Sequence, residues 1–164
     1  AKIPPNDSRW AYVRVRWSYA KRMVGRLNSA LRHARSAKKQ VDRDTQAEWF
    51  AEAALCEGLA TKFVVDHQVA IPVIAEAVAV ASQANDRELE FEGRRMHSVC
   101  LRELGRLDDS AREFKEMNRL ISGGYEIHQR IQARTAFQNM NVLRDGSVST
   151  VKSGFCLGCR KILS

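Results

Sequence analysis

Two cysteines near the C-terminus, Cys156 and Cys159, have the spacing of one half of a zinc site. Thiolates two residues apart can share one metal ion, but a structural zinc ion takes four ligands and no second pair follows in the sequence. Three interpretations stay open: a zinc site completed by other residues, a redox-active dithiol, and a tail with neither role. Apart from zinc at this pair, the sequence predicts no cofactor.

Other side chains that could do chemistry do not form a catalytic pattern. None of the four histidines has a carboxylate and a nucleophile at a spacing that builds a catalytic group. Glu48, Glu52 and Glu57 could act as acids or bases, but their spacing on a predicted helix favours a solvated face. The sequence also has no phosphate-binding glycine loop and no nucleophile elbow. We therefore expect no enzymatic activity.

The composition indicates a globular chain of about one ordinary domain. The 164 residues are 45% hydrophobic and 28% charged, which excludes a wholly disordered chain. The least charged stretch, residues 69–84, contains Glu76 and falls short of the roughly 20 apolar residues of a membrane span. Because no basic-then-apolar signal segment opens the chain, a cytoplasmic location without membrane contact is expected.

Charge is distributed in three blocks. Lys and Arg number 27 and Asp and Glu 19, so the net charge is +8. Residues 1–43 hold 12 basic and 2 acidic side chains, residues 44–93 hold 2 and 10, and residues 94–164 hold 13 and 7. The blocks thus carry +10, −8 and +6. This alternation favours either two basic partner surfaces beside an acidic spacer or consecutive layers that attract each other.

The chain repeats itself with a period of 40 residues. The stretch GRLNSA at 25–30 returns as GRLDDS at 105–110, and small residues recur at equivalent positions. The small-residue sets are Ser18, Gly58 and Ser98; Ala20, Ala60 and Cys100; and Ala30, Ala70 and Ser110. Because side chains three and four apart share one helical face, each unit is predicted to be a pair of helices.

The predicted helices span residues 8–24, 28–41, 45–65, 69–83, 87–104 and 108–121. Gly25 and Gly105 permit the left-handed conformation that ends a helix. The middle unit has Val65 at this position, which predicts a wider corner. Polar side chains are expected to satisfy the free N–H groups at the helix starts. The expected capping residues are Asn28, Asp44, the pair Asn85 and Asp86, and Asp108.

In this pattern the chain resembles the tetratricopeptide repeat family. The best match is the stretch CLRELGRLDDSAREFKEM at 100–117, followed by AKRMVGRLNSALRHARSA at 20–37. The period of about 40 is similar to that of repeats in sensor regions of bacterial regulators of the maltose-activator type. The resemblance covers about residues 10–121 and implies an all-α right-handed superhelix of three antiparallel helix pairs. It predicts architecture rather than activity.

The predicted domain organisation centres on residues 9–141. Units of about 9–43, 44–84 and 85–122 are followed by a capping helix at 125–141. An N-terminal extension, 1–8, precedes this domain, and a hairpin-like or irregular tail, 142–164, carries the Cys-x-x-Cys motif. Since the chain opens without Met, we expect the sensor or interaction part of a larger regulatory protein.

The preferred functional hypothesis is a scaffold that binds a peptide or protein partner in a groove lined by the first helix of each unit. Two arginines in one repeat position would suit an acidic or carboxylate-bearing ligand. The resemblance implies three sets of groove residues: Arg14, Ala54 and Arg94; Trp17, Glu57 and His97; and Lys21, Thr61 and Leu101.

The first helix also supports an alternative function, the binding of RNA or another nucleic acid. Trp17 is predicted to lie in the core, whereas Tyr12 and Tyr19 are predicted to be exposed among arginines. Exposed rings could stack on unpaired bases while basic side chains hold phosphates. The basic surface would comprise Arg9, Arg16, Arg22, Arg26, Arg32, Arg35, Lys38, Lys39 and Arg43. Association of copies through exposed end units also stays open.

Overall fold

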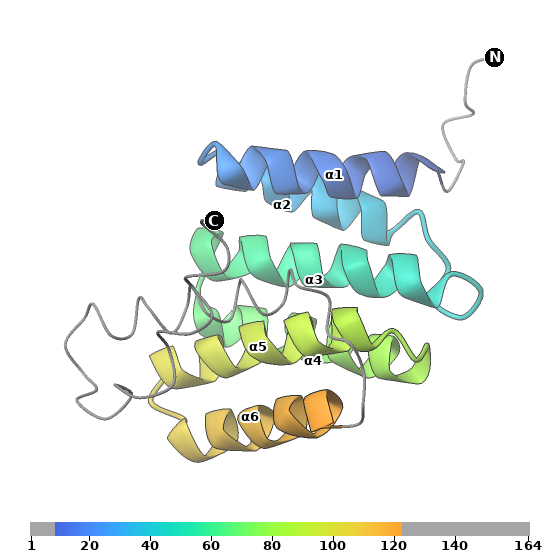
Figure 1. Ribbon diagram of the computed structural model, residues 1–164. Helices are drawn as coiled ribbons and strands as arrows, with labels where there is room; N and C mark the ends of the chain where they lie inside the picture. The colour runs from blue at the N-terminus through green and yellow to red at the C-terminus, as the bar shows by residue number, and fades with distance from the viewer. Residues whose placement is uncertain (1–8, 123–164) are drawn as a thin grey trace, which may run out of the picture. The chain divides into compact units, whose positions relative to one another are not determined.

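The computed structural model describes residues 9–122, which form six α-helices and no strand (Figure 1). The helices are α1 (Arg9–Met23), α2 (Leu27–Lys38), α3 (Ala47–Val64), α4 (His67–Gln83), α5 (Arg87–Glu103) and α6 (Leu107–Ser122). Every predicted boundary lies within three residues of the observed one. The all-α fold is therefore confirmed over this range. The predicted extension 1–8, capping helix 125–141 and tail 142–164 lie outside the described residues.

The helices pack as successive antiparallel pairs. Each helix contacts the next one along the chain, and α3 also contacts both α1 and α5. The second helices of the described units, α2, α4 and α6, lack comparable contacts with one another. Figure 1 shows α1, α3 and α5 stacked in this order, with the corner of each pair at the same edge. The first helices therefore form one layer.

Glycines close two of the three corners, as predicted. Gly25 has φ +74° and Gly105 has φ +73°, the left-handed region that favours glycine. The N–H of Arg26 donates to the carbonyl of Lys21 at 2.8 Å, which satisfies one of the last free carbonyls of α1. The middle corner is narrower rather than wider, because only Val65 and Asp66 separate α3 from α4.

Aspartates cap two helices. The Asp86 carboxylate accepts the N–H of Leu89 at 3.0 Å, as predicted, and Asp66 accepts that of Val69 at 2.7 Å. Both bonds satisfy N–H groups that the first turn leaves without a helical partner.

The other capping predictions are wrong. Because α2 and α6 begin at Leu27 and Leu107, Asn28 and Asp108 lie inside the first turn rather than before it. Between the first two units the carboxylate that holds the turn belongs to Asp42, not Asp44. It accepts the N–H groups of Asp44 at 3.0 Å and of Thr45 at 2.8 Å.

Two of the small-residue sets meet at the crossing of each outer helix pair. The Ser18 hydroxyl of α1 donates to the carbonyl of Ala30 in α2 at 2.9 Å. In the third unit the direction is reversed, and the Ser110 hydroxyl of α6 donates to the carbonyl of Ser98 in α5 at 3.1 Å. Small side chains at both positions let the two backbones approach, so the 40-residue register is visible in three dimensions.

Trp17 does not lie on the buried side of the first helix. The core residues of α1 are Ala11, Val15 and Ser18, whereas Trp17 is 50% exposed and Val24 is also exposed. The prediction of a core Trp17 is therefore wrong. The physical reason is that no described helix precedes α1 to cover the side on which Trp17 lies.

The two tyrosines of α1 differ. Tyr12 is exposed, as predicted, but Tyr19 is partly buried and packs against the core. Its hydroxyl donates to the thiol of Cys56, and burial raises the pKa of Tyr19 well above its usual value. The prediction that Tyr19 is exposed is wrong, since α3 covers it.

Candidate functional site

The structure contradicts a groove built from the predicted sets. Ala54, Thr61 and Leu101 are 0%, 1% and 2% exposed, so none of them can contact a partner. Glu57 is not on a solvated face, because its carboxylate meets Arg35 at 3.0 Å and Lys38 at 3.6 Å, both on α2. Glu57 therefore faces the second helix α2 rather than an open groove.

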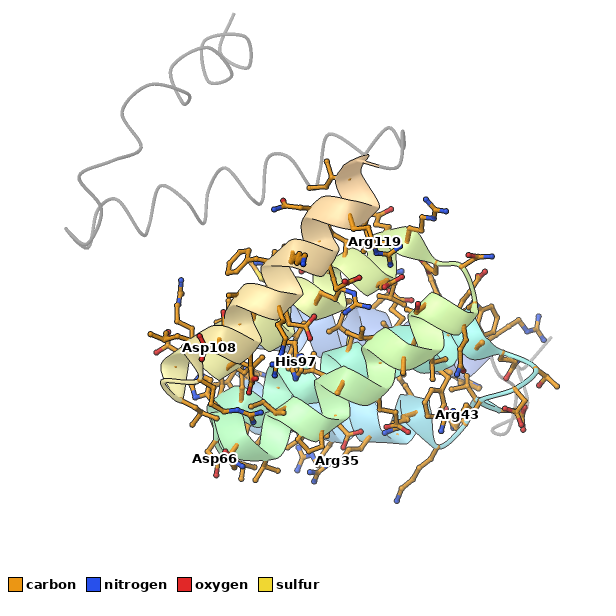
Figure 2. All side chains as sticks on the ribbon, turned by 90° about the horizontal axis from the view of Figure 1, so that it is seen from below. Arg35, Arg43, Asp66, His97, Asp108 and Arg119 are labelled. Carbon is orange, nitrogen blue, oxygen red and sulfur yellow. The ribbon has the colours of Figure 1, made fainter. Side chains whose placement is uncertain are left out.

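In the third unit, too, the predicted residues turn toward a second helix. Arg94 donates to Glu113 of α6 at 3.1 Å and to the buried Glu90 at 2.8 Å. His97 lies alongside α6 in Figure 2, with Nδ1 3.0 Å from Glu113. Burial favours the protonated form of Glu113, but its hydrogen bonds with His97 and Arg94 lower the pKa below the usual value. The cluster is a stabilising contact between α5 and α6.

The layer of first helices exposes a different set of side chains. Arg16 of α1 meets Glu52 of α3 at 2.9 Å, so Glu52 is paired rather than solvated. Farther along the layer, the charges of Arg22 on α1 and of Arg95 and Glu103 on α5 act on Lys62 of α3. We call this surface the first-helix face. It comprises the exposed or partly exposed Tyr12, Arg16, Tyr19, Arg22, Glu52, Lys62, Phe63, Glu92 and Arg102, together with the buried Arg95.

The sequence contained a signal for this face that the predicted groove missed. Arg22, Lys62 and Arg102 are 40 residues apart, so one repeat position is basic in all three units. The predicted groove sets occupy neighbouring positions on the same helices. In the second and third units, side chains at those positions point toward the second helices.

Aromatic rings and guanidinium groups alternate along α1 on this face. The Arg16 guanidinium lies 4.8 Å from the ring centroid of Tyr12 and 6.0 Å from that of Tyr19. Arg22 lies 5.6 Å from the Tyr19 centroid on the other side. Cation–π contacts of this kind hold both groups in place, and the Tyr12 ring stays exposed.

Lys62 is one of two cations of this face, with Arg22, that no described carboxylate pairs. Its side chain is partly buried, and burial lowers the pKa of Lys62 below its ordinary value. The ammonium lies 4.5 Å from the ring centroid of the exposed Phe63. Among residues 9–122, Lys62 has no carboxylate within ion-pair distance, whereas Arg16 and Arg95 each have one.

The predicted basic surface is divided. Arg35, Lys38 and Arg43 reach Glu57 or Glu76 of the acidic middle unit, and the Lys38–Glu76 distance is 2.5 Å. Figure 2 shows Arg35 and Arg43 on the surface of the molecule, at the middle and at one edge. The acidic block thus neutralises cations of the first unit. The other members of the predicted surface are partly or fully exposed: Arg9, Arg22, Arg26, Arg32 and Lys39.

Metal and membrane features can be judged for the described range. No group of three or more His, Cys, Asp or Glu between residues 9 and 122 could hold a metal ion. Cys156 and Cys159 lie outside this range. None of the six described helices is long and apolar enough to cross a membrane. No protein-family model, curated protein or solved structure matches the chain.

Proposed function

We propose that this protein is a non-enzymatic helical-repeat scaffold that binds an acidic or carboxylate-bearing peptide of a partner on its first-helix face. The observation that carries the proposal is Lys62, a partly buried ammonium that has no carboxylate within ion-pair distance among the described residues, although the charge of Glu103 acts on it from farther away. A buried cation without an anion is costly, so an incoming carboxylate gains more there than at a solvated lysine.

The neighbours of Lys62 extend this preference. Arg22 and Arg95 strengthen the positive potential around the ammonium, and the exposed Phe63 supplies apolar area beside it. Tyr12 and Arg16, at the other end of α1, offer a ring and a guanidinium already held against each other. Pre-organised groups lose little entropy on binding, which favours an extended peptide that crosses α1 and α3.

Nucleic-acid binding has less support. Four of the predicted phosphate-binding cations, Arg16, Arg35, Lys38 and Arg43, already pair with carboxylates. A phosphate would have to displace those partners. The peptide proposal also agrees with the resemblance to tetratricopeptide repeats, with a cytoplasmic location and with a sensor or interaction role in a larger regulatory protein.

The proposal can be tested by fluorescence anisotropy with a labelled peptide of alternating Glu and Ala that ends in a free carboxylate. The matched probe replaces Glu by Gln and is amidated. We expect the acidic probe to bind and Lys62→Met to weaken binding roughly tenfold, equivalent to about 1.4 kcal/mol. Lys115→Met, at an exposed site on α6, is the control and should bind like the wild type.

Two results would overturn the proposal. One is equal binding of the acidic and neutral probes. The other is tighter binding of a generic single-stranded RNA than of the acidic peptide at low salt, with a steep loss as salt rises, which would favour the nucleic-acid function.

A further inference from the structure

Within residues 9–122, the first unit has an open surface whose equivalents in the other two units are covered. In the second and third units, one side of the first helix receives the second helix of the preceding unit. Thus the Lys38 ammonium of α2 lies 5.3 Å from the Phe50 ring centroid of α3. Likewise a Cβ on Gly93 of α5 would lie 2.7 Å from Val78 of α4. This side of a first helix is built to receive a helix.

No described helix covers the equivalent side of α1. Trp17 is 50% exposed, whereas the side chains of Glu57 and His97, at the equivalent positions, are 13% and 14% exposed. Lys21 is partly exposed where Thr61 and Leu101 are buried. We call this open surface the leading face. It consists of Trp10, Val13, Arg14, Trp17 and Lys21 of α1 and His33 of α2.

The leading face lacks a carboxylate that the third unit has. Arg14 is the repeat equivalent of Arg94, which donates to Glu113 of α6 at 3.1 Å. His33 stands at the position of Glu113 and faces Trp17 instead. The Nε atom of Arg14 is buried and has no hydrogen-bond partner within residues 9–122. An acceptor from outside would satisfy it.

The positive charge around the leading face indicates that a helix bound there would be acidic. Residues 8–41 contain ten Lys or Arg and no Asp or Glu. Burial and the nearby cations Arg14, Lys21 and Arg32 lower the pKa of His33, so positive potential is concentrated here. A second copy does not match this surface, because two leading faces would repel each other. If α6 of a second copy packed on the leading face instead, the exposed Lys115 would take the position that Arg35 of α2 has against α3, and would add another cation.

We propose that the leading face binds an acidic amphipathic helix of a partner protein, seated on α1 as α2 is seated on α3. Its apolar side would cover Trp17 and Val13, and a carboxylate at its edge would accept hydrogen bonds from Arg14. This binding surface is separate from the first-helix face, so it does not depend on the peptide-binding function proposed above.

The test uses a fluorescein-labelled amphipathic helical peptide with Leu and Ala on one side and Glu on both flanks. The matched peptide carries Gln in place of Glu. We expect the Glu peptide to bind at least tenfold more tightly than the Gln peptide. Trp17→Ala and Arg14→Gln should each weaken binding roughly tenfold. The matched control variants are Trp49→Ala on α3 and Arg119→Gln on α6, and both should bind like the wild type.

Controls separate this proposal from its alternatives. Lys62→Met should leave binding of the helical peptide unchanged, whereas a loss equal to that of Trp17→Ala would place the peptide on the first-helix face and overturn the inference. Failure of the wild type to bind, or binding by Trp17→Ala and Arg14→Gln as tight as that of the wild type, would also overturn it. So would light scattering that shows stable self-association abolished by Trp17→Ala, because a second copy would then cover the face. Circular dichroism checks that Trp17→Ala is still folded. If Trp17→Ala is unfolded, the binding of Arg14→Gln alone tests the proposal.

Discussion

The ring of Trp17 meets the ring of His33 edge-on, with 5.4 Å between the centroids and 75° between the planes. Eighty residues later the same two repeat positions hold His97 and Glu113, joined at 3.0 Å. The repeat therefore conserves a contact between first and second helix while its chemistry changes from aromatic to ionic. This change leaves α1 and α2 with a basic, aromatic surface and no carboxylate on either helix.

The surroundings of His33 predict an unusual titration. Since burial and the cations Arg14, Lys21 and Arg32 lower the pKa of His33, its NMR titration midpoint should lie below the ordinary value of 6.5. The unfolded chain then binds the proton more readily, so stability should fall as the pH drops through 6.5 toward the folded-state midpoint. Arg14→Gln should move the midpoint upward. A wild-type midpoint above 6.5 would contradict the described environment.

The crossing of α3 and α4 depends on the absence of a side chain at Gly58. A Cβ there would overlap Cγ1 of Ile74, which is fully buried. Gly58→Ala should therefore lower the free energy of unfolding by about 1–3 kcal/mol, measured by urea denaturation. Ile74→Ala removes Cγ1 and with it the overlap, so the double variant should lose less than the sum of the two single variants. Strict additivity would show that the two residues do not touch.

Lys62 should stabilise binding and destabilise the fold. Because burial lowers its pKa below the ordinary 10.5, the unfolded chain holds the proton more tightly, and stability should rise as the pH approaches 10.5. Lys62→Met should raise the midpoint of thermal denaturation at pH 7 and remove this rise. Lys115→Met, at an exposed site, should change neither. A variant with lower stability would show that the ammonium has a favourable partner in the folded protein.

The two helical cysteines should be unreactive in the folded protein. Both are buried, and burial raises the pKa of the Cys56 thiol to about 12 and also raises that of Cys100. In a variant with Cys156 and Cys159 replaced by Ser, thiol titration at pH 8 should be slow under native conditions. It should be rapid and complete in denaturant. Fast native reaction would contradict the packing of α1 on α3.

The 40-residue repeat was enough to predict the helices, because it fixes the length of each helix, the position of each corner and the equivalent positions in the three units. Gly25 and Gly105 marked two corners correctly, and the small-residue sets meet where the period requires. The direction in which each set points could not be predicted from the period, which shows only that Trp17, Glu57 and His97 are equivalent. That direction depends on which neighbouring helix packs against the side of the first helix that carries these residues. For Trp17 no described helix does, so hydrophobicity alone favoured a core position that the structure does not give it.

NMR mapping would show directly whether the first-helix face binds acidic peptides, as we propose. Amide shifts of the labelled protein would be followed during titration with the Glu-Ala peptide. We predict the largest changes around Tyr12, Arg22 and Lys62, with little change on α2 and on the outer side of α4. Changes confined to α2 and α4, or none at saturating peptide, would show that acidic peptides do not bind the first-helix face.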